Sequence, residues 1–180
     1  HVRIYQRISG AWTQIGNDIN GEGEWNRSGS SVALSSDGSI VTIGAPFKGS
    51  YGNWSGNWSG HVKTYQNIGG NWTQIANNIE GEGTDDRSGT SVALSVDGSV
   101  VAVGASYNEG VNRYYTGHVR IYQNDNDTWT QIGSDIDGEA ADDESGHSVA
   151  LSADGSVVAI GALHNDGNGD NSGHVRIYHN

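Results

Sequence analysis

The 180-residue sequence contains no cysteine and only one proline. Without cysteine, the chain can form neither a disulfide nor a thiolate metal site, and it has no cysteine nucleophile. Its hydrophobic content of 34% is low for a single deep core. No apolar run approaches the roughly 18 residues of a membrane-spanning helix, so we expect no membrane insertion.

Basic residues are also scarce, because nine Lys and Arg stand against 21 Asp and Glu, and the formal net charge is -12. Binding to nucleic acid requires clustered Lys and Arg, so we expect no nucleic-acid partner. Glycine, in contrast, is abundant at 28 residues, and most apolar runs are short, β-branched and bounded by Gly, Asn, Asp or Ser. This pattern predicts many tight turns between short strands, and hence an all-β fold.

A phrase of the form HVxxY recurs four times along the chain, at His1, His61, His118 and His174. The parts of the sequence that follow it align without gaps over 1–45, 61–105 and 118–162. A recurrence of this kind is typical of solenoids, propellers and tandem arrays. We divide the chain into repeat 1 (1–60), repeat 2 (61–117), repeat 3 (118–173) and the start of a fourth repeat (174–180).

Each repeat contains four short strand candidates. The segment SVALS comes before an Asp-Gly turn, which is a strong hairpin signal, and a segment such as SVVAIGA follows the turn. A loop of variable length then leads to HVRIYQ or HVKTYQ, and a further turn leads to WTQI. Four antiparallel strands in a repeat of this length fit a blade of a β-propeller. We expect Trp12, Trp72 and Trp129 to cover the outer seams between blades.

The segment GSSVALSSDGSIVTIGAP, residues 29–46, resembles the FG-GAP repeat of the integrin alpha-subunit propeller and its microbial and algal relatives. Gly44-Ala45-Pro46 matches the Gly-Ala-Pro element, and Gly-Ala recurs without proline at 104–105 and 161–162. The Phe-Gly element survives only as the glycine of the Ser-Gly pairs at 28–29, 88–89 and 145–146. The resemblance covers the whole chain and implies a propeller fold, although one fold hosts unrelated functions.

Calcium-binding members of that family carry an Asp-x-Asp-x-Asp-Gly loop, which here has shrunk to a hairpin with Asp37, Asp97 or Asp154 alone. Calcium takes about six to eight oxygen ligands, so we interpret these residues as turn formers. We expect no calcium there and no cofactor elsewhere. Three blades are too few to close a ring, so we interpret the chain as part of a larger propeller or array, with a head-to-tail pair of chains as the alternative.

The variable loops contain aromatic residues in polar, glycine-rich surroundings. Such residues hold sugar rings in many lectins and serve as hot spots for protein partners. Packing of the rings over the bases of the loops explains them equally well. These candidate binding residues are Tyr51, Trp54, Trp58, Tyr107, Tyr114 and Tyr115.

Two sets of polar residues suggest ions or acid–base chemistry. Asp166, Asn168 and Asp170 alternate like the first half of a calcium loop, but no distal glutamate follows, so we favour a flexible loop over a metal site. Glutamates recur in the loops that precede SVALS, where we favour hydrogen bonding within the loop over catalysis. These glutamates are Glu22, Glu82 and Glu139.

No contiguous catalytic motif such as GxSxG, HExxH or a P-loop is present. We therefore expect a non-enzymatic, extracellular structural or adhesive module, for example of a surface coat or filament, that assembles with other chains or copies of itself. The alternative is a lectin-like propeller that binds glycans through its aromatic loops. Glycosylation sequons suit a secreted or cell-surface protein and lie at Asn26, Asn53, Asn57, Asn71 and Asn126.

Overall fold

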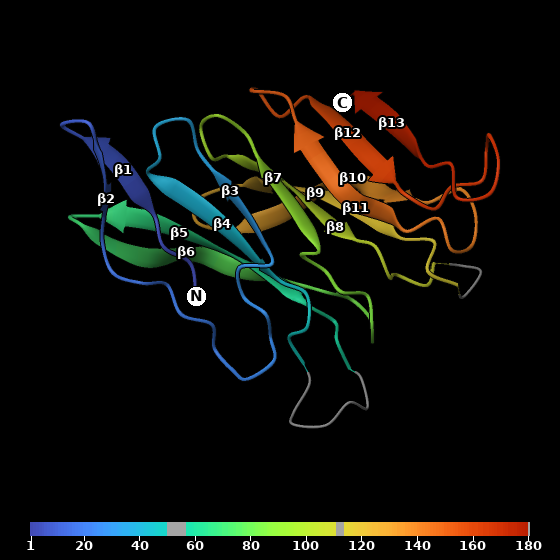
Figure 1. The fold of residues 1–180 in the computed structure, drawn as a ribbon, viewed down its shortest axis with the longest axis horizontal. Helices are drawn as coiled ribbons and strands as arrows, with labels where there is room; N and C mark the ends of the chain where they lie inside the picture. Colours follow the sequence, from blue (N-terminus) through green and yellow to red (C-terminus); the bar gives the residue numbers. More distant parts are fainter. Residues whose placement is uncertain (50–56, 111–113, 180) are drawn as a thin grey trace.

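A computed structural model describes residues 1–49, 57–110 and 114–179 of the chain (Figure 1). Within these ranges the chain forms thirteen strands in four antiparallel sheets, and it forms no helix, so none is available to cross a membrane. The prediction of an all-β fold built from blade-like sheets is therefore confirmed. In Figure 1 the sheets follow one another from the blue N-terminal hairpin to the red strand β13.

The first sheet is a hairpin of β1 (Tyr5–Ile8) and β2 (Ala11–Gln14). Blade 1 consists of β3 (Ser31–Leu34), β4 (Ile40–Ala45), β5 (His61–Ile68) and β6 (Asn71–Glu80). Blade 2 consists of β7 (Ser91–Leu94), β8 (Val100–Ala105), β9 (His118–Asn124) and β10 (Trp129–Asp137). Blade 3 consists of β11 (Ser145–Leu151), β12 (Val157–Ala162) and β13 (His174–His179).

Each blade begins with a hairpin that is closed by an Asp-Gly turn. In blade 2, Asp97 Oδ1 accepts hydrogen bonds from the hydroxyls of Ser95 (2.7 Å) and Ser99 (2.8 Å) and from the Ser99 N–H (3.0 Å). The same bonds recur in the other two blades, where the serine hydroxyls and N–H lower the pKa of Asp37 and of Asp154 to about 2. The turn-forming role that the sequence predicts for these aspartates is confirmed.

The apolar core lies in the seams between neighbouring sheets. Val101 and Val103 of blade 2 pack with Val62 and Ile79 of blade 1, and Trp129 completes this cluster from the outer strand β10. Trp72 covers the preceding seam, where its Nε1–H donates to the Ile15 carbonyl oxygen (3.0 Å). Two of the three tryptophans therefore lie at seams as predicted, whereas the Trp12 side chain is exposed.

The blades approach each other most closely where one strand carries glycine. The Ser91 hydroxyl of blade 2 donates to the Gly146 carbonyl oxygen of blade 3 (2.7 Å), and Ser31 makes the equivalent bond from blade 1 to Gly89 (2.8 Å). A Cβ atom at Gly104 would overlap the Gly146 carbonyl oxygen. Glycine at positions 44 and 104 therefore permits the backbone contact between neighbouring blades.

Candidate functional site

The structure contains a pocket of about 520 Å³ at the end of blade 2 where β9 begins and β10 ends. This volume lies within the range of small-molecule sites. Of its ten lining residues five are acidic, and none of those described is Lys or Arg. The acidic residues are Glu82, Asp86, Glu109, Asp135 and Asp137.

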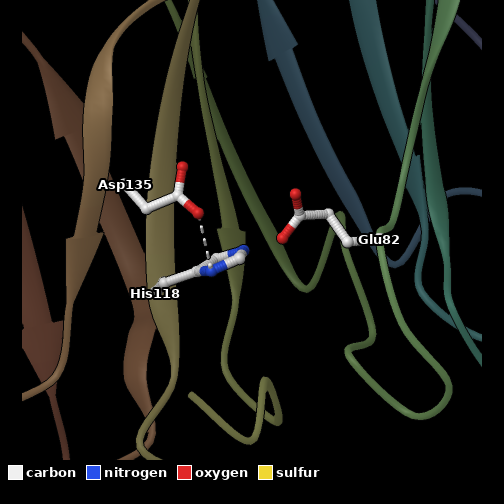
Figure 2. Close-up of side chains that lie close together, drawn as sticks. All are labelled: Glu82, His118 and Asp135. Atoms are coloured by element: carbon white, nitrogen blue, oxygen red, sulfur yellow. Dashed lines mark ion pairs between the residues drawn. The ribbon is translucent and has the colours of Figure 1, made fainter. Parts of the chain in front are cut away.

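His118 is the central residue of this pocket because it is the first residue of β9 and pairs with Asp137 of β10 and Ala105 of β8. Its side chain is only 5% exposed, and its Nδ1 lies 3.8 Å from Asp135 Oδ2. Figure 2 shows the carboxylates of Asp135 and Glu82 turned toward the His118 ring from two sides. Burial, followed by the charge of Arg120, lowers the pKa of His118, so the imidazole is neutral at pH 7.

Arg120 holds the two carboxylates beside His118. It lies two residues further along β9, on the same face, and its Nε and Nη2 donate to Asp135 Oδ1 (2.9 Å) and Oδ2 (2.8 Å). The same guanidinium forms an ion pair with Glu82 from the loop that precedes blade 2. Hydrogen bonding from Arg120 lowers the pKa of Asp135, so this carboxylate stays ionised and oriented.

The group of Glu82, His118 and Asp135 has the composition of a metal site, because one ligand atom from each lies within 4.8 Å of the others. However, the Arg120 guanidinium already compensates the charge of both carboxylates. A divalent cation would bind here only if Arg120 moved away. As the residues stand, the arrangement is better suited to acid–base chemistry than to metal binding.

Blade 1 carries a related cluster, beside which the described residues form a much smaller cavity. His61 and Lys63 take the positions of His118 and Arg120, and Lys63 forms an ion pair with Glu22. The cavity beside His61 and Glu22 measures only about 10 Å³.

A salt bridge distinguishes the two blades at this end. In blade 1, Lys48 Nζ lies 2.8 Å from Glu80 Oε2. Blade 2 has Asn108 and Asp137 at the corresponding positions, and both residues line the open pocket. Asn108 is uncharged, and the Asp137 side chain is shorter than that of glutamate. The two residues therefore cannot form the salt bridge seen in blade 1, and we attribute the open pocket to its absence at these two positions.

Of the aromatic residues predicted to bind ligands, Trp58 and Tyr107 lie around Arg87 and do not line this pocket. The Arg87 guanidinium lies 3.5 Å from the centre of the Tyr107 ring and 5.3 Å from that of Trp58, and Tyr107 packs on Tyr115. Tyr114 is exposed. Tyr51 and Trp54 lie outside the described residues, and a binding role for the whole set stays a prediction.

Several of the other predicted sites lie in loops, whereas the sequon residue Asn71 is the first residue of β6. Asp166 Oδ1 accepts the Asn171 N–H (2.7 Å), and Asn168 N–H donates to Ser172 Oγ (3.2 Å). A metal role for Asp166, Asn168 and Asp170 stays a prediction. Of the sequon asparagines, Asn57 Oδ1 accepts the Thr84 hydroxyl (2.6 Å), and Asn53 lies outside the described residues.

The sequence analysis singled out Glu82, for which it favoured hydrogen bonding within the loop, and it noted His118 only as part of the recurring HVxxY phrase. It missed Asp135, Arg120 and Asn108. Asp135 lies in a part of β10 that extends beyond the predicted WTQI strand, within the bulge between Ile132 and Ile136. Two signals were available in the sequence. His118 and Arg120 alternate on one strand face, and Asn108 stands where the preceding repeat has lysine.

We expect the free energy of unfolding to fall as the pH decreases below 6.5. Burial lowers the folded-state pKa of both His61 and His118 from 6.5. Between that lowered pKa and 6.5 the unfolded chain binds more protons than the folded chain, so stability rises with pH in this window and is lost toward acid. Urea unfolding at about pH 7.5 and about pH 5.5 measures the effect, since carboxylates titrate mainly below this range.

The variant His118→Gln is the control for this pH dependence. It removes one of the two titrating groups, so the difference between the two pH values should shrink. Equal stability of the parent at both pH values would contradict the expectation.

Comparison with known proteins supports the fold. Residues 135–178 match the family model described as the FG-GAP repeat, so the resemblance seen in the sequence is confirmed over that segment. No curated protein matches the sequence.

Among solved structures, the chain is similar to the periplasmic gluconolactonase PpgL of Pseudomonas aeruginosa, with 17% identity, a TM-score of 0.56, and coverage of 98% of this chain and 45% of that protein. Kuenenia stuttgartiensis hydrazine synthase matches at 13% identity and TM-score 0.48, over 83% of this chain and 44% of the other. A candidate 6-phosphogluconolactonase from Bacteroides uniformis matches at 16% identity and TM-score 0.46, over 82% and 39%. The chain thus spans less than half the length of each, and at these identities the likeness concerns the fold.

The expectation of a non-enzymatic structural or adhesive module, with a lectin-like module as its alternative, is corrected by this comparison. One solved structure that matches over 98% of this chain is that of a protein named as an enzyme. The physical reason for the error is that the residues around the blade 2 pocket come from separate loops and strands, so no contiguous motif signals them.

Proposed function

We propose that the protein hydrolyses a lactone, the cyclic ester of a polyhydroxylated acid, in the pocket of blade 2. The observation that carries this proposal is the buried, neutral imidazole of His118, which lines a cavity of about 520 Å³ between the carboxylates of Asp135 and Glu82. A neutral imidazole at pH 7 is the group best suited to accept a proton from water.

The reaction assigns one role to each group. His118 accepts a proton from a water molecule as that water attacks the carbonyl carbon of the lactone. Asp135, at 3.8 Å, stabilises the imidazolium that forms, and Glu82 adds to this on the other side of the ring. The ring C–O bond breaks, and the proton passes from His118 to the departing alkoxide oxygen. The product is an open-chain hydroxy acid, which releases its own proton to solvent.

The charge of the pocket supports a neutral substrate. Five acidic side chains line it, and carboxylates accept hydrogen bonds from the hydroxyl groups of a polyol. The same carboxylates would repel a phosphate group, and none of the described lining residues is Lys or Arg. A neutral sugar lactone therefore fits better than its phosphorylated form. The name of the Pseudomonas aeruginosa protein of similar fold, a gluconolactonase, agrees with this substrate class.

The test is acid release at constant pH from glucono-δ-lactone and from its 6-phosphate, corrected for spontaneous hydrolysis. We expect the parent protein to accelerate hydrolysis of the neutral lactone, and to act at least about tenfold less efficiently on the phosphate, in keeping with like-charge repulsion. No acceleration of either lactone would contradict the proposal, and a preference for the phosphate would contradict the substrate class.

The matched control is the double variant Asn108→Lys with Asp137→Glu. It installs in blade 2 the salt bridge that joins Lys48 and Glu80 in blade 1, without changing His118 or Asp135. We expect this variant to fold normally and to lose activity, because the bridge covers the pocket. Full activity in the double variant would place the reaction elsewhere.

A secreted or cell-surface location is also a proposal. It is supported by sequon asparagines that lie outside the strands, such as Asn26 and Asn126. We propose no nucleic-acid partner, given the excess of acidic residues.

A further inference from the structure

Three positions that meet in space at the start of each blade hold different residues in blade 3 from those in blades 1 and 2. In the first two blades an arginine stacks on an aromatic ring, with Arg27 4.1 Å from the centre of Phe47 and Arg87 3.5 Å from that of Tyr107. The third position is a hydroxyl residue, and Thr90 Oγ1 donates to the Arg87 carbonyl oxygen (2.8 Å).

Blade 3 replaces all three residues together. Glu144 takes the position of Arg87, His147 that of Thr90, and His164 that of Tyr107. The repeats are otherwise very similar in sequence. The joint replacement of a cation–aromatic pair by one carboxylate and two imidazoles therefore indicates a different function for this part of blade 3. A glutamate with two histidines is a set of ligands for a transition metal.

The three side chains lie next to one another. Glu144 lies between the two rings, with Oε2 3.6 Å from His147 Nδ1 and Oε1 3.8 Å from His164 Nε2. Around tetrahedral zinc, with ligand bonds of about 2.0–2.2 Å, neighbouring donor atoms lie about 3.3–3.5 Å apart. The two rings face different oxygens of Glu144, and one ligand atom from each of the three residues does not lie within 4.8 Å of the other two. Binding of a common ion therefore requires the histidine side chains, which are about half exposed, to rotate toward each other.

The orientation of His164 is the second observation that points to a cation. Its Nδ1 lies 2.6 Å from Asn171 Oδ1, so Nδ1 carries the hydrogen that this oxygen accepts. In the neutral ring, Nε2 then presents its lone pair to Glu144 Oε1, and two acceptors face each other at 3.8 Å. A positive charge between them relieves this contact. An outer partner that fixes the tautomer of a histidine is the usual arrangement around metal ligands.

We propose that Glu144, His147 and His164 bind one divalent transition-metal ion of the zinc class, with water in the fourth position. Two imidazole nitrogens select zinc and its neighbours over calcium and magnesium, which prefer oxygen ligands. The site lies on blade 3, and it does not depend on the hydrolase activity proposed for the blade 2 pocket.

The experiment is calorimetric titration of the metal-free protein with Zn²⁺ and, separately, with Ca²⁺. We expect the parent to bind one zinc ion with a dissociation constant in the micromolar range or tighter, and calcium at least about 100-fold more weakly. The thermal midpoint should rise with zinc, because the ion binds the folded state. No zinc binding by the parent would overturn the proposal.

The matched variant is Glu144→Arg, His147→Thr and His164→Tyr in one chain, which installs the blade 2 residues in blade 3. We expect it to fold like the parent and to lose the zinc-dependent rise in thermal midpoint. The single variant His164→Asn, expected to weaken binding at least about tenfold, provides the test if the triple variant does not fold. Binding that stays unchanged in either folded variant, or that is lost in His118→Gln instead, would place the ion elsewhere and overturn the proposal.

Discussion

Gly104→Ala is expected to lower the free energy of unfolding by about 4 kcal/mol and the thermal midpoint by about 8–16 °C. The added Cβ would overlap the carbonyl oxygen of Gly146, which belongs to the neighbouring blade, and the hydroxyl of Ser91. Because the obstacle is backbone, blade 3 must move away from blade 2 as a unit. The Ser91–Gly146 hydrogen bond (2.7 Å) is then lost as well.

Gly161→Ala is the matched control for this substitution. Gly161 has the same place in blade 3, but among the described residues a Cβ there would overlap only the side chain of Ser148, which is exposed and can rotate. We expect a change of less than about 1 kcal/mol, since alanine also restricts the unfolded chain.

Thermal and urea unfolding of both variants measure the difference. Equal losses for Gly104→Ala and Gly161→Ala would mean that the glycine serves its own strand and not the contact between blades. The prediction therefore tests the seam geometry separately from the strand itself.

The repeat and the blade-like sheets could be read from the sequence because they depend on local, periodic signals. The Asp-Gly turns set the hairpins, and the serines that flank Asp97 complete them within five residues of chain. The positions of Trp72 and Trp129 at seams could also be predicted, because a large aromatic residue that recurs once per repeat has few other places to pack.

The candidate site could not be read in the same way because it depends on contacts between repeats. Glu82 precedes blade 2, Arg120 lies on β9, and Asp135 lies within a bulge in β10 that the strand pattern does not reveal. The cavity beside His118 further depends on Asn108 and Asp137, which stand where blade 1 has the salt bridge between Lys48 and Glu80.

The prediction of a non-enzymatic protein failed for the same reason. It rested on the lack of contiguous catalytic motifs, which is weak evidence for a fold whose sites are built from several blades. The three replaced residues of blade 3 were overlooked because 144, 147 and 164 are separated along the chain and meet only when β11 and β12 pair.

His118→Gln is expected to lower kcat for a neutral lactone by at least about 100-fold, within the usual range for loss of a general base. Glutamine preserves polarity and approximate size but cannot accept the proton. KM should change little, because the carboxylates that would hold the hydroxyl groups of the substrate stay in place. His61→Gln should keep the activity of the parent, since His61 has a related strand position in blade 1 but only about 10 Å³ of cavity beside it.

The measurement that tests this account most directly is therefore the rate of acid release from glucono-δ-lactone by the parent, His118→Gln and His61→Gln, each compared with spontaneous hydrolysis. We predict that the parent and His61→Gln accelerate the reaction equally and that His118→Gln loses nearly all of the acceleration. Equal rates in all three folded proteins would contradict the assignment of catalysis to the blade 2 pocket.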